Sequence, residues 1–331
     1  MSVLILSHDD VYAALPPEAC AEAMAAVLAE HARGGTYLPL RSVIRPPGAA
    51  GLMGLMPGWR GQREGKDAAF ALKAICIIPG NPARGLDAHQ GLVTLFDGET
   101  GVPTAILDAS AVTAIRTAAV SAVATGLLAR DDARTLAILG AGVQARSHLR
   151  ALANVRGFEQ VRVYAPTAAH ARAVVEEADL PSGELSVATS AEEAVRGADV
   201  VVAVTNSPEP VLQRAWLEPG AHVNAVGAST LRTRELDSET VAASALFCDS
   251  RESLRNEAGE FARAVAEGAI PGEEHIRAEL GEVLAGMAPG RRDDGELTLF
   301  RSLGVAIEDL AAAERAVATA RERGIGIEVD L

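Results

Sequence analysis

Residues 135–145, TLAILGAGVQA, place a glycine-rich turn directly after a short apolar run and directly before a helical segment. Gly140, Gly142 and Ala145 have the spacing G-x-G-x-x-A. In this pattern the first glycine permits a tight turn, the second lets the backbone approach a pyrophosphate, and the small third residue lets helix and strand pack closely. N–H groups at the start of a helix favour an anion. The stretch therefore predicts a strand, a turn and a helix that bind a dinucleotide.

The segments after this turn alternate between strand-like and helix-like patterns, through VRVYAP, AEEAVRGADVVVAVT, AHVNAVGAS and ALFCDS. Such alternation predicts an α/β domain of the Rossmann type, with a doubly wound parallel sheet. Ser190 and Glu193 have the spacing of a capping box, which opens a helix between two of these strands.

The region before this domain has a different pattern, which predicts an α+β fold. Residues 6–35 predict two helices, with Ser7 and Asp10 at the first cap and a pair of prolines between the helices. Strand-like runs follow, including AAFALKAICII (68–78), and LVTLFDGETGVPTAILD (92–108) predicts a β-hairpin. Near the end of the chain, residues 305–323 predict one long amphipathic helix.

Composition excludes several classes of protein. The chain has 331 residues, enough for two domains, and 49% of them are apolar. A net charge of −14 without a clustered basic face argues against a nucleic-acid partner. The three cysteines lie too far apart for a zinc pattern or a disulfide framework, so no metal site is predicted. The amino terminus lacks a basic n-region, and no stretch is expected to reach the ~20 apolar residues of a membrane helix. A cytoplasmic location is therefore expected.

The residues expected at the ribose of the dinucleotide do not decide between NAD and NADP. The strand that begins at Val161 ends near Ala165, Pro166 and Thr167, where an NAD enzyme usually carries Asp or Glu. Thr167, with His170 and Arg172, could instead meet a 2′-phosphate, although such residues are equally ordinary at the start of a helix. The cofactor is therefore predicted as NAD(P)(H), with NADP slightly favoured.

Lys73 interrupts the apolar run 68–78, and it is one of only two lysines in the chain, the other being Lys66. A buried ammonium must be paired or have its pKa lowered, because stripping its water is costly. Arg41 in LPLRSVI and Arg116 in AVTAIRTAAVSAVATGLL have a similar setting. Three cations in apolar segments favour one shared anion, a substrate carboxylate held by arginine and lysine. Structural Asp or Glu partners are the alternative.

The stretch 79–145, PGNPARGLDAHQGLVTLFDGETGVPTAILDASAVTAIRTAAVSAVATGLLARDDARTLAILGAGVQA, closely resembles the ornithine cyclodeaminase and mu-crystallin family. The resemblance continues through NAVGAS, TRELD and SLGVAIED. It implies a substrate-binding and dimerisation domain of residues 1–117 and 304–331, and a dinucleotide-binding domain of residues 118–303 between them. It also implies that Arg41, Lys73 and Arg116 bind the substrate carboxylate.

The same resemblance implies the cofactor contacts and one departure. The implied contacts are Thr117 and the turn of Gly140, Gly142, Val143 and Gln144 at the pyrophosphate, and Thr205, Val226 and Leu303 beside the nicotinamide. Members that convert ornithine to proline have an aspartate in NAVGGD, where this chain has Ser229, and mu-crystallin-like ketimine reductases have serine there too. The missing carboxylate removes a general base and a partner for the distal ammonium of ornithine.

The hypothesis is an NAD(P)-dependent oxidoreductase that reduces a small cyclic α-imino acid, such as Δ1-pyrroline- or Δ1-piperideine-2-carboxylate. Arg41 and Arg116 would fix the carboxylate, Lys73 would donate or relay a proton, and Ser229 completes the catalytic set. His89 is a weaker candidate. The alternatives are an ornithine cyclodeaminase, an alanine-dehydrogenase-like enzyme, an NADP-dependent ligand-binding protein and, less favoured because of the dinucleotide motif, pyridoxal phosphate on Lys73. A homodimer without a membrane partner is expected.

Overall fold

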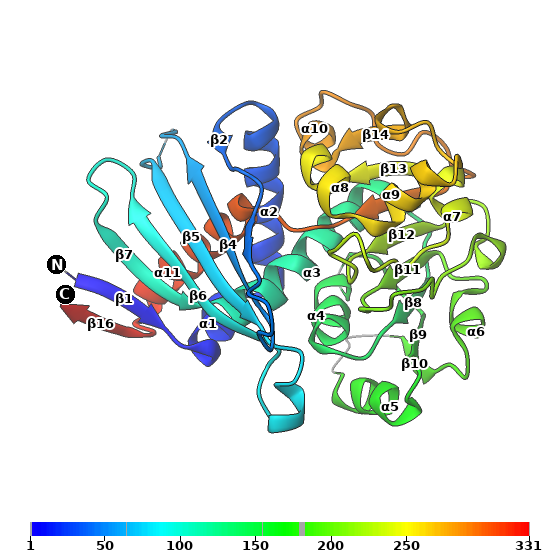
Figure 1. Ribbon diagram of the computed structural model, residues 1–331, viewed down its shortest axis with the longest axis horizontal. Coiled ribbons are helices and arrows are strands. Elements are labelled where there is room, and N and C mark those ends of the chain that lie inside the picture. Colours follow the sequence, from blue (N-terminus) through cyan, green and yellow to red (C-terminus); the bar gives the residue numbers. More distant parts are fainter. Residues whose placement is uncertain (1, 64, 154, 179–182, 331) are drawn as a thin grey trace. The chain divides into compact units, whose positions relative to one another are not determined.

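The computed structural model describes residues 2–63, 65–153, 155–178 and 183–330 (Figure 1). The chain divides into two compact units: unit 1 contains Met1–Arg116 and Gly304–Leu331, and unit 2 contains Thr117–Leu303. The expected division lay between residues 117 and 118 and between 303 and 304. One division therefore falls inside a helix, α3 (Ala109–Leu128), and the other falls just before α11 (Ala306–Arg323).

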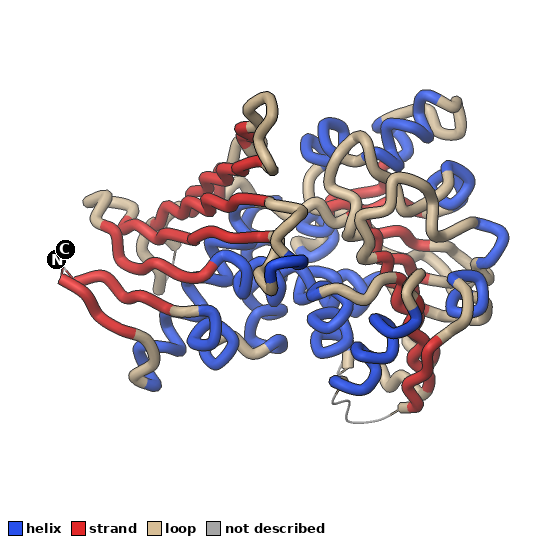
Figure 2. Tube along the Cα trace, turned by 60° about the horizontal axis from the view of Figure 1, so that its bottom comes forward, coloured by secondary structure: helices blue, strands red, loops and turns tan. Residues whose placement is uncertain are grey.

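Unit 1 is built on one mainly antiparallel sheet with strand order β16-β1-β7-β6-β5-β4-β2, to which β3 is added through β4. Helix α11 packs against β4, β5, β6 and α2, and Figures 1 and 2 show the helices of this unit on one side of its sheet. The strands are β1 (Ser2–Leu6), β2 (Thr36–Tyr37), β3 (Ser42–Ile44), β4 (Leu52–Arg60), β5 (Ala69–Ile77), β6 (His89–Asp97), β7 (Pro103–Asp108) and β16 (Ile327–Asp330). Besides α3 and α11, the helices are α1 (His8–Ala14), α2 (Pro17–Ala32) and the 3₁₀ turn η1 (Pro82–Arg84).

Alternation along β5 gives this sheet two different faces. Ala71, Lys73 and Ile75 are buried beneath the helices. The residues between them point to the opposite face, on which Phe70 keeps 45% of its surface exposed and Leu92 of β6 keeps 52%. Because successive side chains of a strand point to opposite faces, an apolar run such as 68–78 has one buried face and one open apolar face.

Unit 2 is built on a parallel sheet with strand order β10-β9-β8-β11-β12-β15-β13-β14. The strands are β8 (Thr135–Leu139), β9 (Gln160–Tyr164), β10 (Glu184–Val187), β11 (Val200–Ala203), β12 (His222–Ala225), β13 (Ala245–Cys248), β14 (Ile276–Glu279) and β15 (Thr298–Arg301). The helices are α4 (Val143–Leu152), α5 (Ala168–Glu177), α6 (Ala191–Val195), α7 (Ser238–Ala243), α8 (Arg251–Glu257), α9 (Gly259–Ala266) and α10 (Leu280–Leu284), with the 3₁₀ turns η2 (Arg214–Trp216) and η3 (Glu273–His275).

The order of these strands sets where a ligand can bind. The chain runs outward from β8 through β9 to β10 and then returns to β11, on the other side of β8. Leu136 and Ile138 of β8 belong to one core cluster and Ala137 and Leu139 to another, so both faces of the sheet are covered. Ligands of such sheets bind outside the carboxyl ends of the strands, at the point where the strand order reverses. That point lies between the carboxyl ends of β8 and β11, where the glycine turn directly follows β8.

Most of the predicted elements are confirmed in the structure, including the helix pair at the amino terminus, the hairpin β6–β7 and the long helix α11. Ser7 and Asp10 form the predicted capping box. At α6 only half of the predicted box forms: Ser190 accepts a hydrogen bond from the N–H of Glu193, but the Glu193 carboxylate binds the backbone and hydroxyl of Thr189.

Helix α3 corrects one expectation. Its 20 residues are apolar enough to cross a membrane by length and composition, so the expectation that no stretch reaches this length is wrong. In the structure, 78% of the 18 most apolar consecutive residues of this helix are buried, and Ala119, Val120 and Ala124 are fully inaccessible. Such burial is typical of a core helix, which is apolar on all sides because protein surrounds it.

Candidate functional site

The glycine turn between β8 and α4 has the geometry of a pyrophosphate site. Gly140 has φ +127°, and a Cβ there would lie 2.7 Å from the carbonyl oxygen of Val204. Gly142 caps α4, and a Cβ on it would meet no atom within 4 Å. Ala145 is fully buried where α4 packs on the sheet. The first glycine is therefore required by the fold, whereas the second leaves space that a phosphate can enter.

Of three further predicted residues, two open the helix after this turn and the third lies on α3. Val143 and Gln144 are the first two residues of α4, whose opening N–H groups have no carbonyl partner earlier in the helix. Thr117 is buried on α3, and its neighbour Ala118 packs in the same core cluster as Ala145 of α4. The structure therefore places Val143 and Gln144 at the start of α4, and Thr117 on a helix that packs in the same core as α4.

The predicted ribose residues lie at the end of the neighbouring strand β9. Ala165 is buried, Pro166 and Thr167 are exposed, and Thr167 is the N-cap of α5. His170 and Arg172 are exposed on the same helix. The carbonyl oxygen of Tyr164 accepts a hydrogen bond from the N–H of Gly140, which ties the end of β9 to the glycine turn. No carboxylate stands in residues 165–167 to bind ribose hydroxyls.

The predicted nicotinamide residues share the same edge of the sheet. Thr205, Val226 and Leu303 each follow the carboxyl end of a strand, β11, β12 and β15 respectively, and these three strands are neighbours. Ser229 is exposed in the loop after β12. Because all these strands are parallel, their carboxyl ends lie at the edge that carries the glycine turn.

In unit 1, Lys73 lies in a buried cluster of charges. Its Nζ donates to Asp309 Oδ1 at 2.9 Å and lies 2.8 Å from Oδ2. Arg116 donates from Nε to Asp309 at 3.1 Å and from Nη1 to Glu308 at 2.8 Å. All four side chains are at least nine-tenths buried. Glu308 and Asp309 stand in the first turn of α11, where the helix dipole favours carboxylates.

This geometry corrects the electrostatic argument made from the sequence. Burial of Lys73 and Arg116 was expected to require a substrate carboxylate, but the two positive charges meet the two negative charges of Glu308 and Asp309. The alternative of structural acidic partners is therefore the one that the structure shows for these two cations. A role for them in substrate binding needs support other than their burial.

The sequence did not predict Glu308 and Asp309 as the partners of Lys73 and Arg116, because they are remote from both cations in the sequence. Asp309 stands 236 residues after Lys73. The usable signal was the pair of acidic residues in the first turn of the predicted amphipathic helix, in the quoted stretch SLGVAIED. In unit 2, the buried Glu235 of the quoted stretch TRELD was also missed.

The cluster shifts the pKa values of its members. Burial, with a smaller contribution from the positive charge of Arg116, lowers the pKa of Lys73 to about 8, although Asp309 favours the ammonium. Burial alone would raise the pKa of Asp309, but the charges of Lys73 and Arg116 together hold it below its usual value. Lys73 therefore titrates close to neutral pH while its carboxylate partner stays ionised, which suits proton transfer.

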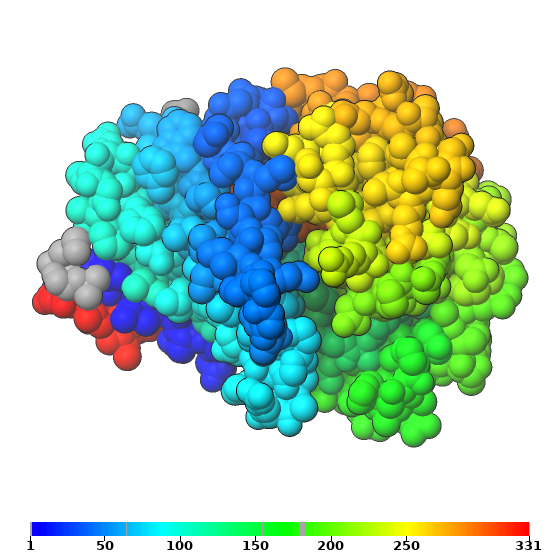
Figure 3. Space-filling model, in the orientation of Figure 1, coloured from blue at the N-terminus to red at the C-terminus, as the bar shows by residue number. Residues whose placement is uncertain are grey.

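Arg41 approaches the same cluster from the loop between β2 and β3, a stretch that lies on the surface in Figure 3. Its Nη2 donates to the carbonyl oxygen of Gly304 at 3.0 Å. Gly304 has φ +76°, and a Cβ there would lie 2.4 Å from Arg116 Nη1. Both guanidinium groups therefore lie against Gly304, so the structure brings Arg41, Lys73 and Arg116 together at the start of α11.

His89 stands at the start of β6, within electrostatic reach of this cluster. Partial burial of its ring and the positive charge of Lys73 lower its pKa, against the attraction of Asp87. This shift favours the neutral imidazole, and the interactions described for His89 link it to the cluster only electrostatically.

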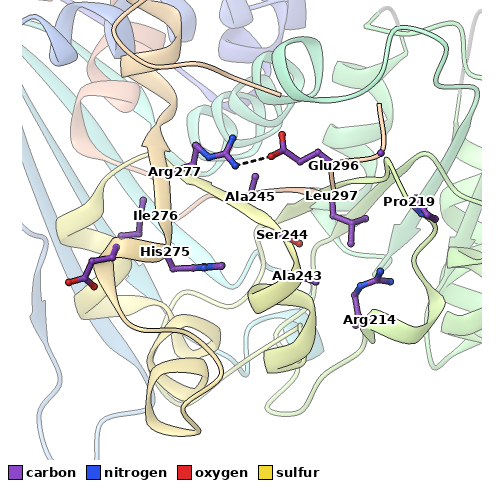
Figure 4. Close-up of a pocket in the computed structure, with 12 residues that line it drawn as sticks. Arg214, Pro219, Ala243, Ser244, Ala245, His275, Ile276, Arg277, Glu296 and Leu297 are labelled. Atoms are coloured by element: carbon purple, nitrogen blue, oxygen red, sulfur yellow. Dashed lines mark hydrogen bonds and ion pairs between the residues drawn. The ribbon is translucent and has the colours of Figure 1, made fainter. Parts of the chain in front are cut away.

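Figure 4 shows a groove of about 730 Å³ in unit 2. It lies at the amino ends of the strands, whereas the glycine turn lies at their carboxyl ends. It is lined by the residues that precede or begin β13, β14 and β15, among them Ala245, Ile276 and Leu297. Two arginines border it, and one of them, Arg277, is already paired with Glu296 at 2.8 Å. Since parallel sheets bind nucleotides at their carboxyl ends, this groove is not the dinucleotide site.

Comparisons with known proteins match nearly the whole length of the chain. A family model described as the ornithine cyclodeaminase/mu-crystallin family matches residues 1–323. Ketimine reductase mu-crystallin of Mus musculus is 39% identical over 281 residues, which cover 85% of this chain and 84% of that protein.

Two solved structures share the fold along the whole chain. Δ1-Pyrroline-2-carboxylate reductase of Thermococcus litoralis, in complex with NADH and L-proline, matches with a TM-score of 0.94 and 37% identity, covering 99% of this chain and 100% of that one. An archaeal alanine dehydrogenase dimer with bound NAD matches with a TM-score of 0.92 and 32% identity, covering 100% of both chains. The α/β fold predicted from the sequence is thereby confirmed.

Proposed function

This chain belongs to the ornithine cyclodeaminase/mu-crystallin family, and we propose that it is an NAD(P)H-dependent reductase of small cyclic α-imino acids. Δ1-Pyrroline-2-carboxylate, reduced to proline, is the substrate that we favour. The observation that carries the proposal is the match over the whole chain to a reductase solved with NADH and L-proline. L-Proline is the product expected of such a reduction, so that complex contains the expected product together with the reduced cofactor.

The reaction adds a hydride to the imine carbon and a proton to the imine nitrogen. NADH or NADPH supplies the hydride and is oxidised, while the carbon–nitrogen double bond becomes a single bond. In this proposal Lys73 donates the proton to the imine nitrogen, because an ammonium with a pKa of about 8 is protonated at neutral pH and releases a proton readily. Asp309 stays ionised beside it and holds the ammonium in place.

Substrate binding is assigned to the two arginines that lie against Gly304. Arg41 and Arg116 present guanidinium groups, which bind a carboxylate in a planar, bidentate way. The internal pairing of Arg116 fixes its orientation before substrate arrives, so less side-chain entropy is lost on binding. A carboxylate fixed in this way turns the imine carbon toward a defined direction, which is the main contribution that the protein makes to hydride transfer.

Cofactor binding is assigned to the edge of unit 2 described above. Thr117, Gly140, Gly142, Val143 and Gln144 would hold the pyrophosphate, Ala165 to Thr167 the ribose, and Thr205, Val226 and Leu303 the nicotinamide, with Ser229 beside the reacting atoms. The two solved relatives are described with NADH or NAD bound. For this chain the proposal also includes NADPH, slightly favoured, because β9 ends without a carboxylate that would repel a 2′-phosphate.

The proposal extends to a homodimer. The open face of the unit 1 sheet carries exposed apolar side chains on adjacent strands, including Met53 on β4, Phe70 on β5 and Leu92 on β6. A contiguous exposed apolar face of this kind favours association. A second copy of the chain is the proposed partner, in keeping with the dimer described for the archaeal alanine dehydrogenase.

The deciding experiment measures oxidation of NADH and of NADPH with Δ1-pyrroline-2-carboxylate, with Δ1-piperideine-2-carboxylate and with pyruvate plus ammonium, alongside proline release from ornithine. We expect a cyclic imino acid to give the highest kcat/KM. Pyruvate with ammonium as the best substrate would instead establish the alanine-dehydrogenase-like reaction, which the likeness to that enzyme favours as the second candidate. Proline formed from ornithine at unchanged NADH would establish cyclodeamination, and tight ligand binding without turnover would establish a binding protein.

A further inference from the structure

Three buried charged residues of unit 2 lie behind the edge that would hold the nicotinamide, and the reaction above does not use them. Glu235 precedes α7, Glu260 is on α9 and Arg301 ends β15. Their exposed fractions are 0%, 2% and 1%. Arg301 Nε donates to Glu260 Oε2 at 3.2 Å, and Glu260 Oε1 accepts from the backbone N–H of Glu235 at 2.9 Å. They form one connected group.

The Glu235 carboxylate joins the ends of two neighbouring strands. One oxygen accepts from the backbone N–H of Thr205, directly after β11. The other accepts from the N–H groups of Gly227 at 2.7 Å and Ala228 at 3.1 Å, directly after β12. Hydrogen bonds from backbone N–H groups to a buried carboxylate are among the stronger ones in proteins, so these two strand ends are held in one fixed position.

Arg301 adds the third strand. Its Nη1 donates to the carbonyl oxygens of Ala225 at 2.8 Å and Ser302 at 2.6 Å, at the ends of β12 and β15. The three strand ends joined in this way are those that carry Thr205, Val226 and Leu303. The group of charges therefore lies under the residues proposed to contact the nicotinamide.

The backbone at this point is built for close contact. A Cβ on Gly227 would lie 1.9 Å from the carbonyl oxygen of Thr205 and 2.3 Å from its nitrogen, so only glycine allows the two strand ends to approach this closely. The loop then continues to Ser229, two residues after Gly227. Because the Glu235 carboxylate holds the backbone of Gly227 and Ala228, it also fixes the position of the backbone at the next residue, Ser229.

We propose that Glu235 is a positioning residue for hydride transfer, whose carboxylate fixes the backbone at Thr205, Gly227 and Ala228 against the nicotinamide ring. The inference rests on the proposed function, because that function places the ring at this edge. Glu235 acts through backbone groups that would contact the cofactor, and its removal misplaces the ring without removing the pyrophosphate site at Gly142.

The ionisation of Glu235 makes nicotinamide affinity depend on pH, which would not be expected if the residue only packed against its neighbours. Burial and the negative charge of Glu260 raise its pKa, against the hydrogen bonds from Thr205 and the charge of Arg301. A protonated carboxyl presents an O–H toward groups that are themselves donors, so protonation weakens the hydrogen bonds that hold the strand ends. Nicotinamide affinity should therefore fall as the pH is lowered through this pKa.

The test uses Glu235→Gln, which keeps the shape but sets an amide N–H₂ against backbone donors. We expect kcat for imino-acid reduction to fall by on the order of tenfold to a hundredfold, the loss typical of a misplaced reactive group. The Kd for NADH should rise while the Kd for ADP-ribose, which lacks the nicotinamide, stays unchanged. In the wild type the affinity for NADH relative to that for ADP-ribose should fall at acidic pH. In Glu235→Gln this ratio should not depend on pH. Glu239→Gln, an exposed glutamate on α7, is the matched control and should behave as the wild type.

Two outcomes overturn the inference: Glu235→Gln with wild-type kcat and a wild-type affinity ratio, or an equal loss of NADH and ADP-ribose affinity, which would mean a general disturbance of unit 2. Because the affinity ratio is measured without substrate, the proposed function can fail separately. A wild type that reduces no imino acid, together with the expected ratio in the variant, would refute that function and support the role of Glu235 at the nicotinamide.

Discussion

At the scale of single residues, Lys73 shows what a sequence can and cannot reveal. A lysine inside an apolar strand needs an anionic partner, and the structure shows that Lys73 has one. The partner is Asp309 on α11, which reaches Lys73 only when α11 packs on β5, and no local pattern near either residue encodes that packing. The sequence therefore predicts that a buried charge is compensated, but not by which residue.

Replacing Lys73 by Met should remove the proton donor while keeping a side chain of similar length in the strand. Arg116 would still pair with Asp309, so the buried carboxylate keeps a partner. We expect kcat for imino-acid reduction to fall by about a hundredfold or more, the usual contribution of general acid catalysis. Lys66→Met is the matched control, since Lys66 is the other lysine of the chain and is 46% exposed. Wild-type turnover in Lys73→Met would show that Lys73 has no catalytic role.

The pKa of Lys73 also predicts the pH dependence of the two directions of the reaction. Reduction needs the ammonium form, so kcat/KM for the imino acid should decline as the pH rises through about 8. Oxidation of the amino acid needs the neutral amine, so its kcat/KM should increase over the same range. Initial rates in both directions between pH 6 and 10 measure this. A flat profile for both directions would exclude proton transfer by Lys73.

At the scale of elements, local rules are reliable where the structure is local. Caps, glycine turns and prolines predicted α1, α2, the hairpin β6–β7 and the turn before α4, because each depends on neighbours in the sequence. The pattern of AAFALKAICII predicted a strand, but an apolar run of this kind does not tell which of its two faces is covered. That choice depends on where α11 packs, far away in the chain.

Substitutions in the glycine turn can distinguish the role of Gly142 in cofactor binding from the role of Gly140 in the fold. Gly142→Ala introduces a Cβ that meets no protein atom within 4 Å, so the free energy of unfolding should barely change, whereas the Kd for NADH should rise by on the order of tenfold, or about 1.4 kcal/mol. Gly140→Ala forces a side chain into a backbone conformation with φ +127° and against Val204, so it should lower the free energy of unfolding by about 1–3 kcal/mol. Thermal unfolding and fluorescence titration measure both. An equal loss of stability in the two variants would contradict the separate roles.

At the scale of the whole molecule, the open face of the unit 1 sheet leads to a prediction about assembly. Leu92→Asp places a charge among exposed apolar side chains, so it should convert a dimer into a monomer in sedimentation or light-scattering measurements. Met287→Asp changes an exposed apolar residue of unit 2, 62% exposed against 52% for Leu92, and should leave the dimer intact. A dimer that survives Leu92→Asp would place the interface elsewhere.

The pairing of β1 with β16 joins the two extremes of the chain, with Ser2 opposite Asp330, so the N and C labels of Figure 1 lie side by side. During synthesis on the ribosome, residues 117–303 emerge complete before α11 and β16 do. Unit 2 can therefore fold while unit 1 still lacks its last strand and its central helix. Until Asp309 has been synthesised and α11 packs on β5, the Lys73 ammonium lacks its carboxylate partner and stays hydrated.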